Sequence, residues 1–224
     1  MRLIVALLAA AWLGAHAQVP PSPAERAAYT GLFAAALAGD AGAIRSQAAA
    51  GAKVDARDAR ARTPFHVAAF ARRYDAMRAL VAAGANPNAL EGDRYDAVTI
   101  AAVADDVETL KVALALGNSA RNVTSRYDGT ALIAAAHLGH DAVVRELIRA
   151  GAPLDHVNNL GWTAVFESVA LGNGGPRHVA TLKALVDAGA NVNLADRDGT
   201  TPYTLAFARG FREMVAILAA AGGR

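Results

Sequence analysis

The sequence predicts an all-α solenoid of about six helix-turn-helix repeats with short β-turn fingers. A short phrase that opens with a helix-capping residue begins at positions 30, 63, 96, 130, 163 and 201, so successive copies are 33, 33, 34, 33 and 38 residues apart. A glycine followed by a small residue recurs near the end of each unit, at positions 51, 84, 117, 151, 189 and 222. A period near 33 residues predicts stacked units that bury their apolar faces against one another.

The first 17 residues are expected to be a signal peptide outside this fold. Arg2 supplies a positive charge, residues 3–13 are apolar, and Ala15-His16-Ala17 has the A-x-A form of a cleavage site. The apolar run is shorter than the roughly 20 residues that span a bilayer. A buried core helix or a membrane anchor is the alternative interpretation. We expect cleavage after Ala17, with no membrane insertion of the mature chain.

Residues 18–28 form a lead-in to the repeat domain at 29–224. Ser22-Pro23-Ala24-Glu25 has the form of a capping box with proline at the first helical position. We expect this segment to start a longer helix that runs through Thr30 to about Ala38 and covers the N-terminal end of the stack. A short linear motif is the alternative.

The repeat that begins at Thr63 shows why each unit should fold. Threonine is a good N-cap, and Pro64 follows at the position where a missing N–H costs nothing. A short alanine-rich helix is expected to about residue 72, and a second helix near 76–83 carries apolar residues at i, i+3 and i+4. Gly84 should end that helix because glycine readily adopts the left-handed conformation. The residues after each such glycine are expected to project as a finger.

Residues 63–69 (TPFHVAA) and 80–88 (LVAAGANPN) resemble the ankyrin-repeat pattern TPLHxAA followed by LLLxxGADVN. Gly139-His140 and residues 189–193 (GANVN) add further matches, and the resemblance covers Tyr29 to the C-terminus. It implies a protein-binding module rather than an enzyme. It also implies structural roles for the histidines that match the family pattern, His66 and His140.

Two repeats depart from the pattern. In the third, Asp96 replaces the capping threonine, Asp105-Asp106 replaces the Gly-His turn, Asn118 replaces an alanine, and the loop 120–128 carries one extra residue. We interpret these as drift in a tolerant array, with a partner-facing region as the alternative. The fifth repeat has five extra residues at about 174–178. This insertion lacks the context of a phosphate-binding loop, so we expect a surface bulge, with a binding role as the alternative.

Composition argues against several functions. Removing Arg2 from 22 basic and 20 acidic side chains leaves a net charge of +1, too small to indicate nucleic-acid binding. There is no cysteine and hence no disulfide framework, which suits a bacterial periplasm better than an extracellular animal domain. The histidines match no zinc spacing, and Ser125 and Ser168 lack the frame of a nucleophile elbow. We therefore expect no catalysis, no metal and no cofactor, in a monomeric protein.

Ankyrin-repeat proteins generally bind through finger tips and the exposed side of the first helix, which form a concave surface. Carried over position by position, the resemblance gives the candidate finger residues Arg57, Arg60, Arg62, Arg94, Tyr95, Arg126, Tyr127, Asn158, Trp162 and Arg197. Neighbouring candidates are Asp93, Asn159, Asp198 and the first-helix residues Arg72, Arg73, His137 and Arg209. Tyr95, Tyr127 and Trp162 precede the capping position in three consecutive repeats, so we expect them in one row. The alternative is that each packs against its own finger.

The functional prediction is a non-enzymatic periplasmic protein that binds another protein through this concave surface. The resemblance adds a role in stress or peroxide defence, with which some exported bacterial members of the family are linked. A secreted effector that binds a host protein is the alternative.

Overall fold

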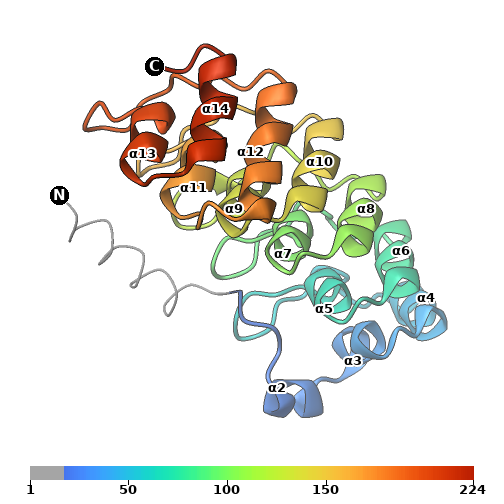
Figure 1. Cartoon of the computed structure of the whole chain (residues 1–224). Helices are drawn as coiled ribbons and strands as arrows, with labels where there is room; N and C mark the ends of the chain where they lie inside the picture. Colours follow the sequence, from blue (N-terminus) through green and yellow to red (C-terminus); the bar gives the residue numbers. More distant parts are fainter. Residues whose placement is uncertain (1–17) are drawn as a thin grey trace.

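The computed structural model describes residues 18–224, which hold thirteen helices and one small hairpin (Figure 1). The predicted signal peptide and its cleavage site after Ala17 lie outside the described residues. In the described part of the chain, none of the helices is long and apolar enough to cross a membrane.

Twelve of these helices form two layers that run the length of the molecule. The inner layer holds the first helix of each repeat, namely α3 (Gly31–Ala38), α5 (Pro64–Phe70), α7 (Ala97–Val103), α9 (Ala131–Leu138), α11 (Ala164–Ala170) and α13 (Pro202–Ala208). The outer layer holds α4 (Ala41–Ala49), α6 (Tyr74–Ala82), α8 (Val107–Ala115), α10 (Asp141–Arg149), α12 (Pro176–Asp187) and α14 (Arg212–Ala220). Each helix contacts the next one in its own layer and its partner in the other layer. The predicted all-α solenoid is confirmed.

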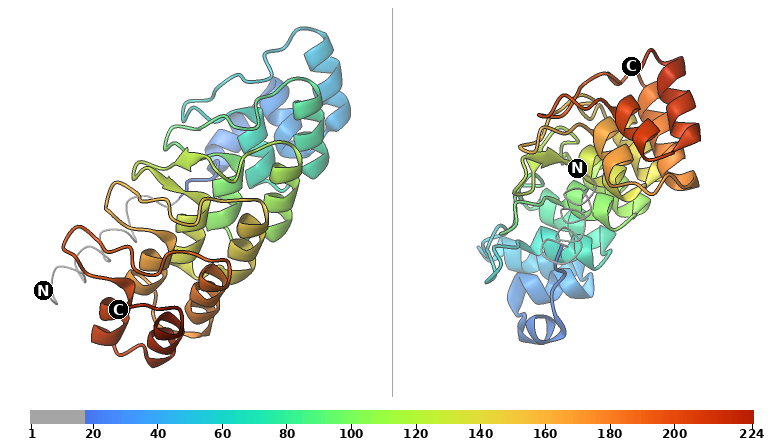
Figure 2. Two further views of the ribbon diagram at one scale, coloured as in Figure 1. Left: turned by 90° about the horizontal axis from the view of Figure 1, so that it is seen from above. Right: turned by 60° about the vertical axis from the view of Figure 1, so that its left-hand side comes forward.

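Five loops, here called fingers, join the repeats and project along one side of the stack (Figure 2). They comprise residues 51–62, 84–95, 117–129, 151–162 and 189–200. Each begins at a glycine with positive φ, as predicted for Gly84, whose φ is 95°. A residue with a side chain adopts this conformation only at a cost, so the second helix ends there.

Small residues let the inner helices approach one another closely. Ala68, Ala102 and Ala136 are fully buried in three successive first helices. The outer layer supplies larger buried side chains, namely Ile44, Leu80, Leu110, Leu147, Leu185 and Leu218. Full burial of one such side chain contributes roughly 1.5–3 kcal/mol. The buried residues form one cluster that runs through the stack, so each repeat buries its apolar face against its neighbours.

The N-terminal end corrects one expectation. The capping box at Ser22 is confirmed, because Ser22 and Glu25 exchange backbone-to-side-chain hydrogen bonds. The single long helix is wrong, since α2 (Pro23–Ala28) ends before Tyr29 and α3 begins separately at Gly31. Tyr29 is extended, stacks on Phe33 and donates its hydroxyl to Asp58. The hydrogen bond to Asp58 holds Tyr29 against the first finger, and the chain turns at this residue.

The third finger is also more regular than expected. Its strands β1 (Val123–Thr124) and β2 (Gly129–Thr130) pair antiparallel, with Val123 opposite Thr130. The extra residue in this loop thus closes a two-stranded hairpin where only a simple turn was predicted.

Candidate binding site on the finger side

Consecutive fingers are linked by their backbones. The amides of Gly92, Ser125 and Asn159 donate to carbonyl groups of the preceding finger at 2.8, 2.9 and 2.8 Å. These bonds satisfy polar backbone groups that the loops would otherwise leave unpaired. The fingers therefore form a continuous edge beside the inner helices.

Four predicted arginines strengthen this edge while remaining exposed. Arg94 pairs with Asp128 at 2.8 Å, and Arg126 pairs with Asp93 at 2.5 Å, each across two fingers. Arg57 and Arg197 donate to backbone carbonyls of a neighbouring finger, at 2.7 and 2.5 Å. Exposed pairs are each worth about 0–1 kcal/mol, so these side chains stay on the surface as candidates. Arg60 is also exposed and lies 3.5 Å from Glu25.

Arg62 is not a surface residue, which corrects the prediction. Its side chain is 1% exposed and lies between Glu25, at 2.5 Å, and Asp58, at 2.8 Å. Burial alone would raise the pKa of Asp58, but hydrogen bonds from Tyr29 and Arg62 lower it. A buried cation has to be paired, so Arg62 joins the N-terminal helix to the first finger.

The first-helix candidates Arg73 and Arg209 also connect repeats. Arg73 Nε donates to the carbonyl of Leu37 at 3.1 Å, and Arg209 Nη1 donates to that of Val169 at 2.8 Å. The last carbonyls of a helix lack partners within the helix, and N–H donors satisfy them. The histidines His140 and His178 bond the ends of α7 and α9 in the same manner. Arg72 instead pairs with Asp106 at 2.6 Å.

The insertion in the fifth repeat packs against both neighbours instead of projecting as the expected bulge. Its end extends α12, which has 12 residues where α10 has 9. His178 reaches back to α9, and Gly174 lies against Phe211 of the sixth repeat. A Cβ at Gly174 would lie 2.5 Å from the Phe211 ring, which explains the glycine.

Two of the departures in the third repeat, Asp96 and Asn118, bond each other and are therefore not independent. The buried carboxylate of Asp96 caps α7 through the Thr99 amide at 2.8 Å. Its second oxygen accepts from the side-chain amides of Asn118 and Asn122, both at 2.8 Å. Asn118 in turn accepts from the Val98 amide at 2.8 Å. A threonine cap paired with an alanine cannot make this network.

His66 holds one wall of the finger side in place, as the resemblance implied. Its Nδ1 accepts from the Thr63 amide at 3.1 Å, so Nε2 carries the proton and donates to the Tyr95 carbonyl at 3.2 Å. Burial lowers the pKa of His66 to about 4, which keeps the ring neutral near pH 7. The histidine thereby fixes the backbone of Tyr95 in the next finger.

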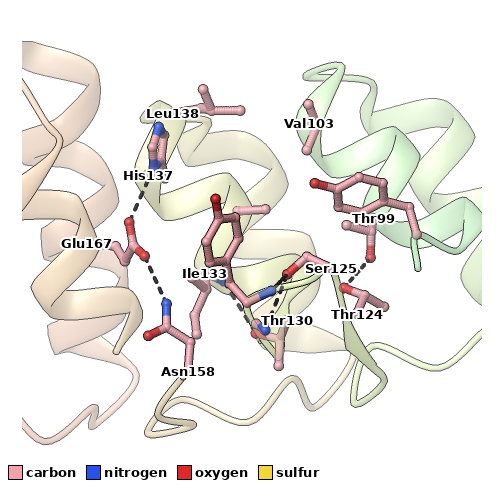
Figure 3. A pocket seen from close by; sticks show the side chains of 14 residues that line it. Thr99, Val103, Thr124, Ser125, Thr130, Ile133, His137, Leu138, Asn158 and Glu167 are labelled. Atoms are coloured by element: carbon pink, nitrogen blue, oxygen red, sulfur yellow. Dashed lines mark hydrogen bonds and ion pairs between the residues drawn. The ribbon is translucent and has the colours of Figure 1, made fainter. Parts of the chain in front are cut away.

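Above this frame, a pocket of about 200 Å³ opens between the second to fourth fingers and helices α7, α9 and α11 (Figure 3). Its apolar and aromatic lining comes from Tyr95, Val103, Tyr127, Ile133, Ala134 and Leu138. Concave sites with apolar walls and a few polar groups are typical of binding sites. Two of the predicted aromatic residues therefore share one pocket.

The third aromatic residue, Trp162, packs within its own repeat. Its ring lies 5.3 Å from that of the buried Phe166. The expected row thus divides, because the tyrosines line the pocket whereas the tryptophan packs against helix α11.

One end of the pocket is polar and contains a residue that the sequence analysis missed. Glu167 is fully buried, accepts from Asn158 Nδ2 at 3.0 Å and lies 3.2 Å from His137 Nδ1 (Figure 3). Asn158 is itself 5% exposed, so this predicted finger residue belongs to the floor and not to the outer surface. Alignment of the six repeats could have identified Glu167, because it stands at a position that is apolar in the other five. Four residues after the capping position, the other repeats carry Ala34, Val67, Ile100, Ala134 and Leu205.

Ser125 lines the other end but is engaged in the turn. Its Oγ accepts from the amides of Tyr127 and Gly129 at 3.2 and 3.4 Å, and its φ is 64°. Figure 3 shows it well apart from His137, whose partner is Glu167. Ser125 is therefore not placed for activation by this histidine.

Comparison with known proteins agrees with this geometry. The chain matches the family models for ankyrin repeats (three copies) over residues 98–175 and for a single ankyrin repeat over residues 61–91. An ankyrin repeat domain from Acinetobacter baumannii is 40% identical, with a TM-score of 0.78, over 86% of this chain and 98% of that one. This chain belongs to the ankyrin-repeat family.

Two further relatives show how far the likeness extends. The ankyrin repeat domain of Bcl-3, a member of the IkappaB family, is 26% identical with a TM-score of 0.77, over 88% of each chain. The putative ankyrin repeat protein YahD of Escherichia coli is 36% identical over 102 residues, which are 45% of this chain and 51% of that protein. The match with YahD thus spans about half the length of that relative. Members of this family generally mediate protein–protein interaction.

Proposed function

We propose that this chain is a non-enzymatic protein that binds another protein through the pocket between its fingers and inner helices. The observation that carries the proposal is the meeting of Tyr95 and Tyr127 with Leu138 at one concave site. Aromatic residues are enriched among those that contribute most to binding energy. Leu138 is 37% exposed at the edge of the pocket, so an arriving side chain would bury apolar surface there.

We further propose that the protein is exported to a bacterial periplasm and acts there as a monomer. The charge, apolar run and A-x-A site in residues 1–17 support export. A role in stress or peroxide defence is proposed from family resemblance. N-terminal sequencing of periplasmic protein should begin at Gln18, and recovery of Met1 from folded cytosolic protein would contradict export.

The binding proposal is tested by site-specific photo-crosslinking in the producing cells. A benzoylphenylalanine in place of Leu138 should give a discrete crosslinked partner, whereas one in place of Arg145 on the outer helix α10 should not. Adding Tyr95→Ala and Tyr127→Ala should abolish the product without changing the thermal midpoint by more than a few degrees.

Trp162→Ala is the matched aromatic control. Because Trp162 packs against Phe166, this variant should lower stability and retain crosslinking at a temperature where it is folded. Equal crosslinking from positions 138 and 145, or survival of the product in the double tyrosine variant, would move the binding surface elsewhere. A product containing a host protein would favour the secreted effector.

A further inference from the structure

We infer that the pocket takes one basic side chain, lysine or arginine, from the partner. This inference rests on the proposed function and specifies the chemistry of the same site. It depends on Glu167, on the shape of the walls and on the charges around the opening.

Glu167 gives the pocket its negative charge. Its carboxylate is fully buried at a register position that is apolar in the other five repeats. Burying a carboxylate costs free energy that hydrogen bonds must offset. Two such contacts are present, to Asn158 and His137, whereas a carboxylate can accept at about four sites. The group therefore retains capacity for a further donor, such as an ammonium or guanidinium.

The walls match the stem of such a side chain. Lysine and arginine carry an aliphatic chain that packs on apolar surface while the charged head meets a polar group. Val103, Ile133 and Leu138 provide apolar surface, and Tyr95 and Tyr127 provide aromatic rings. Rings of this kind also attract cations.

The opening does not repel a cation. Arg94 and Arg126, the arginines of the two fingers beside it, are paired with Asp128 and Asp93. Their positive charge is thus offset by neighbouring aspartates. Because the apolar walls of the pocket have a lower dielectric constant than water, the buried carboxylate attracts a cation more strongly than it would in water.

His137 controls access to the carboxylate. The ring is 19% exposed and lies against Glu167 Oε2 at 3.2 Å, so it separates that oxygen from solvent. His137 is in the last turn of α9. Rotation of the imidazole would let the arriving cation reach the carboxylate, and removal of the ring should make binding easier.

The test uses side-chain analogues as probes of the full 15N-labelled chain. n-Butylammonium and n-propylguanidinium, which reproduce the side chains of lysine and arginine, are compared with 1-pentanol, which has a similar length and no charge. Two-dimensional NMR titration should show saturable shifts of the amides of residues 129–138. The expected dissociation constants for such small probes are of the order of millimolar, and 1-pentanol should bind at least about fivefold more weakly.

Three variants decide whether Glu167 is responsible. Glu167→Gln, which keeps the shape of the side chain, should weaken n-butylammonium binding about tenfold and leave 1-pentanol binding unchanged. His137→Ala should strengthen n-butylammonium binding several-fold, and this opposite change cannot result from unfolding. Glu213→Gln, which removes an exposed carboxylate on α14, is the matched control and should change neither.

The inference is overturned if 1-pentanol binds as tightly as n-butylammonium, if no probe shifts the pocket amides, or if Glu167→Gln leaves n-butylammonium affinity unchanged in a folded protein. If the crosslink from position 138 nevertheless depends on the two tyrosines, the proposed function stands and the partner presents an uncharged side chain. If the charged probes bind through Glu167 but position 138 captures nothing, the preference of the pocket for cations stands and its use for binding a partner protein fails.

Discussion

The network around Asp96 gives the sharpest test of how this sequence specifies its fold. Asp96→Thr restores the residue that caps the other five repeats and can still cap α7. It removes the acceptor for the amides of Asn118 and Asn122, now bonded at 2.8 Å each. A hydrogen bond to a charged group contributes about 1.5–3 kcal/mol. We expect a loss of about 3 kcal/mol in the free energy of unfolding, a large share of the roughly 5–15 kcal/mol typical of a domain.

The partner substitution should show that the two departures depend on each other. Asn118→Ala alone restores the usual small residue but leaves the buried Val98 amide without its acceptor and removes one of the two amides that donate to the second Asp96 oxygen, at a cost of about 2–3 kcal/mol. In the double variant the shared bond is lost only once. We therefore expect it to be more stable than the sum of the single losses predicts, by about 1.5 kcal/mol or more.

The assay is urea unfolding followed by circular dichroism, for the wild type and the three variants. The control pairs Asp96→Thr with Asp40→Ala, which removes the distant cap of α4 and costs about 1 kcal/mol. That pair should be additive within about 0.5 kcal/mol. Additivity of the Asp96 and Asn118 substitutions within the same error would refute the reasoning and return the third repeat to simple drift.

Three further predictions concern single residues. Gly174→Ala should cost about 3 kcal/mol through contact with an aromatic ring and positive φ, whereas Gly84→Ala, which meets no neighbouring atom within 4 Å, should cost only about 1 kcal/mol from φ. Because the pKa of His66 is about 4 when folded and 6.5 when unfolded, the unfolded chain binds the extra proton between these values. The contribution of His66 to the free energy of unfolding is therefore fully present above pH 6.5. It should fall by about 3 kcal/mol as the pH drops to 4. Arg62→Met should cost about 3 kcal/mol by leaving carboxylates unpaired.

Each of these has its own check by denaturant unfolding. Equal losses at Gly84 and Gly174 would show that the ring contact is relaxed. The part of the acid sensitivity due to His66 should disappear in His66→Gln, and unchanged pH dependence in that variant would assign it to other groups. Arg60→Met removes an exposed arginine, 48% accessible and 3.5 Å from the same Glu25, so it should cost less than about 1 kcal/mol. A similar loss of unfolding free energy in Arg62→Met and Arg60→Met would show that the burial of Arg62 does not determine its contribution to stability.

The sequence by itself determined the repeat count and, from Thr63 onward, the approximate starts and ends of the repeat helices. These depend on local chemistry, because a capping residue acts on the next turn and a glycine such as Gly84 acts through its own φ. It also located two residues of the pocket, Tyr95 and Tyr127, since they stand one and three residues before the capping positions of consecutive repeats. Their convergence follows from stacking equal units.

Only the tertiary structure decided which polar residues are buried and what they bond. Arg62 has the sequence context of an exposed finger arginine, yet it pairs with Glu25, 37 residues away. Asp96 and Asn118 look like independent departures until the fold brings them to 2.8 Å. Glu167 stands out in the register, but its meeting with His137 depends on how two repeats stack. Partners that are distant along the chain decide the protonation, burial and role of a side chain, and local sequence patterns carry no record of those distances.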